Sequence, residues 1–116
     1  MVKIINPNGT VSIAADVFTN VAGDAASRCF GVKGMVGKTN GIYQLLRRES
    51  MSKGVFAAFD DDDNTVSIAL HIAVDPGVNL SALGRSIMNE VSYKVSQATG
   101  VTVKRVDVYV DSMLID

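Results

Sequence analysis

The stretch from residue 66 to residue 110 constrains the fold most, because it predicts a strand, a long helix and a second strand in direct succession. Over residues 66–74, apolar side chains alternate with small or polar ones. This period of two is typical of a strand with one buried face. Asp75, Pro76 and Gly77 end the strand, since proline donates no ladder hydrogen bond and glycine permits a tight turn.

The helix of this unit is predicted over Leu80–Thr99, where apolar residues recur at three- and four-residue steps. Asn79 suits the N-cap and Gly100 the position after the C-terminus. A second strand is predicted over residues 101–110, and so short a return most simply joins two parallel strands. The valines of this strand change alternation phase at Lys104 and Arg105. Either a β-bulge or a strand covered on both faces explains the change.

The remaining elements are shorter. Strands are predicted at 10–13 and 54–59, a brief edge strand at 32–36, a helix at 15–29, one or two helical turns at 42–48, a loop at 37–41 and a turn at 60–64. Together these patterns predict an α+β fold. A small mixed β-sheet of about four strands (10–13, 54–59, 66–74 and 101–110) has the two main helices packed on one face and its other face partly open. With no repeat or linker, residues 1–116 are expected to form a single domain.

The composition favours a folded protein in the cytoplasm. Hydrophobic residues make up 47 % of the chain and the formal net charge is -1, so neither disorder nor a general affinity for polyanions is indicated. A single cysteine excludes an internal disulfide. No apolar run approaches the length of about 18 residues that a bilayer span needs, and we expect no signal peptide.

The sequence predicts no catalytic, cofactor or metal site. His71 has no second histidine or cysteine to share a metal with, and we interpret it as a half-buried structural residue. Cys29, next to Arg28, is either a thiol of lowered pKa or, more commonly at such positions, a small apolar filler. The acidic run 60–63 lacks the spaced ligands of a calcium loop, although its affinity for cations is left open.

One charged segment does suggest a function. Between residues 25 and 59 there are six basic residues and one acidic residue, whereas the acidic run follows immediately. A basic segment with interleaved Met and Tyr side chains suits contact with an acidic protein partner, an anionic membrane surface or nucleic acid, although dispersed solvated charges are an equally good interpretation. We define the basic segment by its candidate contact residues: Arg28, Lys33, Lys38, Arg47, Arg48 and Lys53.

A GxxG spacing at Gly34–Gly37 offers an alternative, because K-homology domains clamp a nucleic-acid backbone with a loop of this spacing. Such a loop must join two helices, and here it follows a predicted strand. The alternative function is therefore a small nucleic-acid-binding module that uses the basic segment, and nucleic acid is the less favoured partner.

Several short motifs follow one another along the chain: residues 9–14, 17–18, 21–22, 25–26, 31–35 and 53–55, the strand at 66–74, the helix end at 99–100 and the strand at 106–110. Taken in this order, they resemble those of the alkaline-shock/Gls-type envelope stress response family of Gram-positive bacteria. The chain resembles a short, domain-only member over almost its whole length. It departs from the family pattern at Ala14, where many members carry serine, and over 37–52, where a paired-glycine pattern is missing.

The resemblance implies a non-enzymatic cytoplasmic protein that is linked to cell-envelope homeostasis and held near the membrane by a protein partner. It supplies no catalytic residues and no cofactor. It implies no insertion into the bilayer by the chain itself. Exposed strand edges and the open sheet face are routes to a homo-oligomer.

Overall fold

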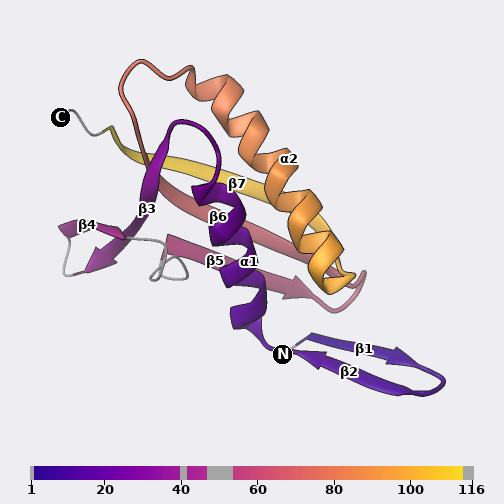
Figure 1. Cartoon of the computed structure of the whole chain (residues 1–116). Helices are drawn as coiled ribbons and strands as arrows, with labels where there is room; N and C mark the ends of the chain where they lie inside the picture. Colours follow the sequence, from indigo (N-terminus) through magenta and orange to yellow (C-terminus); the bar gives the residue numbers. More distant parts are fainter. Residues whose placement is uncertain (1, 40–41, 47–53, 114–116) are drawn as a thin grey trace.

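The structure is a computed structural model, and it describes residues 2–39, 42–46 and 54–113 (Figure 1). Two helices and two β-sheets make up this part of the chain, so the predicted α+β class is confirmed. In chain order the elements are β1 (Val2–Asn6), β2 (Gly9–Ile13), α1 (Ala15–Ser27), β3 (Val32–Thr39), β4 (Ile42–Leu46), β5 (Val55–Asp60), β6 (Thr65–Val74), α2 (Leu80–Thr99) and β7 (Thr102–Met113).

The predicted strand–helix–strand unit is β6, α2 and β7, and β7 pairs in parallel with β6. Both ends of α2 are capped as expected. The Asn79 side chain accepts a hydrogen bond from the Ala82 backbone N–H at 3.0 Å, and Gly100 takes the left-handed conformation with φ of 74°. These local interactions satisfy backbone groups that the ends of a helix otherwise leave unpaired.

Of the two explanations for the phase change in the last strand, the structure shows the β-bulge. Val103 lies opposite Val66, but Arg105 lies opposite Ser67, so Lys104 is the extra residue. The bulge lets Val101 and Val106 both be buried although they fall on different alternation phases. A second shift in register leaves Asp111 as an extra residue near the end of β7.

β6 is the centre of a five-stranded sheet. One of its edges pairs with β7. Its other edge is shared, because β5 pairs antiparallel with the first part of β6 and β3 with the last part. The predicted hairpin of β5 and β6 is confirmed, and β4 extends the sheet beyond β3.

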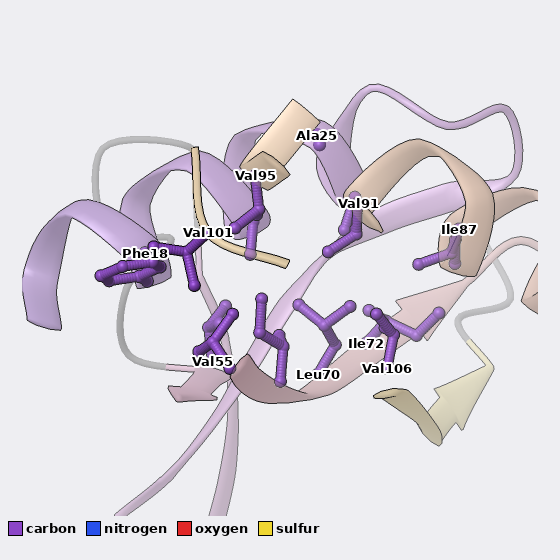
Figure 2. Packing of buried hydrophobic residues seen from close by; sticks show 14 of the residues in the cluster. Phe18, Ala25, Val55, Leu70, Ile72, Ile87, Val91, Val95, Val101 and Val106 are labelled. Carbon is purple, nitrogen blue, oxygen red and sulfur yellow. The ribbon is translucent and has the colours of Figure 1, made fainter. Parts of the chain in front are cut away.

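The core lies between one face of this sheet and the two helices (Figure 2). Alternate residues of β6 point into it and are at most 1 % exposed. α1 contributes Phe18 and a row of alanines, and this small-residue face lets it lie close to α2. The larger buried side chains of the sheet, of α2 and of the turn after it are Val55, Val66, Ile68, Leu70, Ile72, Val74, Leu83, Ile87, Val91, Val95, Val101 and Val106.

Two predictions about the sheet are wrong. The strand at 10–13 is β2, and it does not join the main sheet. It pairs with β1 in a separate antiparallel hairpin, from Val2 opposite Ile13 to Asn6 opposite Gly9. β1 was not predicted from the sequence. A turn of two residues, Pro7 and Asn8, joins it to β2, and so short a connection favours an antiparallel hairpin.

The helical turns predicted at 42–48 are also wrong, because residues 42–46 form β4. The loop predicted at 37–41 begins too early, since β3 continues to Thr39, and β3 lies between β4 and β6 instead of at an edge. The apolar spacing at Ile42, Leu45 and Leu46 fits a helical turn as well as a strand. Pairing with β3 decides between them, from Met35 opposite Leu46 to Thr39 opposite Ile42.

Candidate interaction surfaces

The face of the main sheet that the helices leave uncovered carries an aromatic cluster. His71 from β6 stacks on Tyr109 from β7, with ring centroids 4.7 Å apart and planes at 11°. Phe56 from β5 meets the same imidazole edge-on, at 5.7 Å and 87°. Phe56 is 60 % exposed and Tyr109 48 %, so the cluster offers flat ring surface to a partner.

The His71 ring is also fixed by an acid. Its Nδ1 lies 2.8 Å from the Asp111 Oδ2, and both side chains are largely buried. This contact and the two rings position the imidazole as part of the sheet surface, in agreement with the predicted structural histidine. No signal in the sequence pointed to this pair, because 40 residues separate them and only the parallel register of β6 and β7 brings them together.

A shallow hollow of about 170 Å³ lies beside Phe56 on the same face. Its floor is made of small side chains from β5 and β6, among them Ala58, Ser67 and Ala69. Asp107 from β7 lies at its border, where the carboxylate accepts a hydrogen bond from Arg105 at 2.9 Å. The hollow therefore combines an apolar floor with an acidic group, Asp107, at its border.

An exposed aromatic ring lies within the first part of the basic segment, between Arg28 and Lys33 in the chain. Phe30, in the turn between α1 and β3, is 96 % exposed. Arg28 and Lys33 flank it, and each lies beside a carboxylate. The Arg28 Nε is 3.0 Å from the Asp24 Oδ2 and the Lys33 Nζ is 3.5 Å from the Asp75 Oδ1. Each basic side chain of this part is therefore paired with an acid, and the ring between them in the chain is left exposed.

Next to Phe30 is a groove of about 470 Å³. Its apolar lining includes Pro76, Val78 and Leu83, at the start of α2. A ring that stands fully exposed beside an apolar groove is a feature that sequence reasoning missed. In sequence alone Phe30 is simply an aromatic residue next to a glycine.

The rest of the basic segment is only partly described. Lys38 lies in β3 at the register position opposite Tyr43. Arg47, Arg48 and Lys53 lie outside the described residues. The GxxG residues belong to β3, paired on both sides, and not to a loop between helices as in K-homology domains.

The acidic run has a partner within the chain. The Lys104 Nζ lies 3.5 Å from the Asp60 Oδ2 and 3.4 Å from the Asp63 Oδ2. A hydrogen bond from the Thr65 hydroxyl, with a further contribution from Lys104, holds the pKa of Asp63 below its ordinary value. The pKa of Lys104 is raised by the same two aspartates, Asp63 first. Asp60 and Asp63 of the turn therefore both lie close to Lys104, the extra residue of the bulge.

Cys29 does not have the lowered pKa that its neighbour Arg28 suggested. Burial raises the pKa of the thiol, Glu90 raises it further, and a hydrogen bond with Ser86 opposes the shift. The thiol lies 3.5 Å from the Ala25 carbonyl oxygen and packs against the core. It is therefore the small filler of the alternative interpretation.

Two further observations concern what the described residues contain. Within 2–39, 42–46 and 54–113 there is no group of three or more His, Cys, Asp or Glu side chains that could hold a metal ion. In the same residues no helix is both long enough and apolar enough to cross a bilayer.

These features define a class: a small α+β domain with two helices on one face of a five-stranded sheet, an open aromatic face opposite them and an exposed ring beside an apolar groove. The chain belongs to the alkaline shock protein 23 family, whose model matches residues 3–115 and is described by a cell envelope-related function. The resemblance found in the sequence is thereby confirmed.

Relatives in Gram-positive bacteria are similar over most of their length. The uncharacterised protein YloU of Bacillus subtilis is 32 % identical over 108 residues, which cover 90 % of this chain and 88 % of YloU. The uncharacterised protein Spy1614 of Streptococcus pyogenes serotype M6 is 30 % identical over 115 residues, covering 97 % and 93 %.

Among solved structures, the chain is similar to MamM CTD in its copper form. The TM-score is 0.51 at 17 % sequence identity, over 86 % of this chain and 87 % of that one. A variant of MamM CTD in its nickel form gives a TM-score of 0.50 at 18 % identity, over 84 % and 96 %. At this identity the likeness shows the fold alone.

Proposed function

We propose that this protein is a non-enzymatic cytoplasmic interaction module that acts at the cell envelope through a membrane-anchored protein partner. The family supports the envelope part of this proposal. The interaction part rests chiefly on one observation, the exposed Phe30 in the basic segment. The partner would contact the basic segment around it.

Phe30 supports a protein partner more than a general polyanion. A ring that is 96 % exposed leaves apolar area in water that a partner could cover, and the groove lined by Val78 and Leu83 extends that area. Aromatic and arginine side chains are enriched at the centres of protein interfaces. Arg28 supplies the arginine, although part of its charge is balanced by Asp24.

The charge of the segment supports an acidic contact on the partner. Beyond the paired Arg28 and Lys33, the segment contains Lys38, Arg47, Arg48 and Lys53 with a single acid, Glu49. Complementary charges at the rim of an interface mainly raise the association rate and the specificity. The ring would then supply affinity and the basic residues would orient the encounter.

The test is affinity capture with the tagged full chain from detergent-solubilised membranes, with bound proteins quantified by mass spectrometry. Two variants are compared with wild type: Phe30→Glu, and the triple reversal Lys38→Glu, Arg47→Glu and Arg48→Glu. We expect both to lose the same membrane-anchored protein, since one removes the apolar anchor and the other the complementary charge. The control is Arg85→Glu with Lys94→Glu, which reverses exposed charges on α2.

Far-ultraviolet circular dichroism should show that all variants remain folded. Equal recovery of the partner by wild type and both variants would remove the basic segment as the contact surface. Capture of RNA or ribosomal proteins that nuclease releases would instead favour the nucleic-acid module. The comparisons with known proteins give that alternative no support.

A further inference from the structure

The β1–β2 hairpin extends from the body of the molecule as an arm (Figure 1). Only its base joins the core, through buried Val2 and partly buried Ile4 and Ile13. A hollow of about 320 Å³ lies between β1 and the body, bordered on the body side by residues such as Phe59 and Val101. A two-stranded hairpin is marginally stable by itself in water, so an arm of this kind gains stability from a covering surface.

The outward face of the arm carries one apolar side chain and one charge. Because side chains alternate along a strand, Lys3 and Ile5 point away from the core that Val2 and Ile4 face. Ile5 is 79 % exposed. Lys3 is the one charged residue between residues 2 and 13.

The open sheet face offers the complementary features. The hollow beside Phe56 has an apolar floor, and its volume of about 170 Å³ accommodates one aliphatic side chain. Asp107 is the one charged group among the described residues that line it. This carboxylate already accepts from Arg105, and it retains lone pairs for a second donor.

We propose that the arm of one copy docks on the open sheet face of a second copy, with Ile5 in the hollow beside Phe56 and Lys3 next to Asp107. The contact joins two different surfaces, so each chain keeps a free arm or a free face for another copy. It is separate from the basic segment, and it does not rest on the function proposed above.

The small size of the arm determines how strongly two copies are expected to associate. A contact made by two five-residue strands is smaller than the standard protein interface of about 1,600 Å², and the association should be weak. Sedimentation velocity over a series of concentrations, up to about 1 mM, is therefore the appropriate measurement. The 12.3 kDa chain should show a mass that rises with concentration.

Two variants each remove one half of the contact. Ile5→Glu replaces the apolar side chain and places an acid near Asp107. Ala58→Arg fills the hollow and repels Lys3, and it is tolerated by the fold because Ala58 is exposed. Each should weaken self-association about tenfold to a hundredfold, the loss expected when a large aliphatic side chain is no longer buried.

The decisive sample is a mixture of the two variants. Ile5→Glu retains an intact face and Ala58→Arg retains an intact arm, so together they should form a dimer that grows no further. Phe30→Glu is the matched control, because it removes another exposed apolar side chain, in the turn between α1 and β3 and outside both surfaces, and it should associate as wild type does.

Four results would overturn the proposal. They are a wild-type chain that stays monomeric throughout the series, undiminished association of either variant, a mixture that remains monomeric, and loss of association in Phe30→Glu. The third result would point to a symmetric contact and the fourth to the groove beside α2. The outcome of the capture experiment does not change the result expected in sedimentation, so either proposal can fail without the other.

Discussion

Ile87 and Met88 are neighbours on α2 that lie in opposite environments. Ile87 is 0 % exposed and points into the core between α2 and the sheet, as Figure 2 shows, whereas Met88 is 40 % exposed. Both side chains are large and apolar, and alanine is an excellent helix former at either position. The two alanine variants therefore separate the effect of burial from that of side-chain size.

Ile87→Ala should lower the free energy of unfolding by about 3 kcal/mol, within the range for large aliphatic residues replaced in a packed core. For 116 residues, at an unfolding entropy of about 2.1 cal/mol/K per residue, this corresponds to a decrease in Tm of about 12 °C. Met88→Ala should change the unfolding free energy by less than about 0.5 kcal/mol, because Met88 lies at the surface outside the buried core, with 40 % of its area exposed.

Urea denaturation followed by circular dichroism measures both values, at protein concentrations low enough to keep the chain monomeric. The packing described for α2 is refuted if the two variants lose similar stability, or if Met88→Ala loses more. An unchanged m-value across the series would show that both variants unfold from equally compact native states.

Two further predictions concern local interactions. Asn79→Ala should destabilise the protein by about 1 kcal/mol, because the side-chain acceptor for the Ala82 N–H is lost. Asn79→Asp keeps an acceptor at this position and should retain most of the stability. Urea denaturation measures both variants, and equal losses of stability would contradict the capping role of Asn79. Thr65→Val should raise the pKa of Asp63 toward its ordinary value of 3.8, as measured by NMR titration of the carboxyl carbon. Because the pKa of Asp63 is lower in the folded than in the unfolded state, its ionised form stabilises the fold at pH values above the unfolded-state pKa, and this stabilisation is lost as the pH falls through the folded-state pKa. An unchanged pKa of Asp63 in Thr65→Val would show that the Thr65 hydrogen bond does not lower it.

The sequence was sufficient where the determining interactions are local. The bounds of α2, its cap at Asn79 and its end at Gly100 follow from side chains within one helical turn of each end. The alternation in β6 predicts which residues are buried, and the phase change at Lys104 marks the site of the bulge, which the sequence offered as one of two explanations. The sequence likewise shows that Cys29 has no second cysteine to pair with, and that basic residues are concentrated in one segment of the chain.

Other parts of the structure depend on which segments of the chain pair or pack with one another. Residues 42–46 have a pattern compatible with helix or strand, and pairing with β3 makes them a strand. The strand predicted at 10–13 is not in the main sheet, because it pairs instead with β1, its nearest neighbour in the sequence. The environment of Cys29 is set by α2, through Ser86 and Glu90, and not by the adjacent Arg28.

The candidate surfaces also divide into features that the local sequence determines and features that only tertiary contacts determine. The sequence by itself determined the central strand–helix–strand unit, the family and the basic segment, because each is encoded in residues close together in the chain. The exposed ring of Phe30 beside its groove, the His71–Asp111 contact and the hollow at Ala58 were decided by tertiary structure alone. Each of these joins side chains from separate elements, and the register of β6 with its neighbours fixes distances that no local pattern encodes.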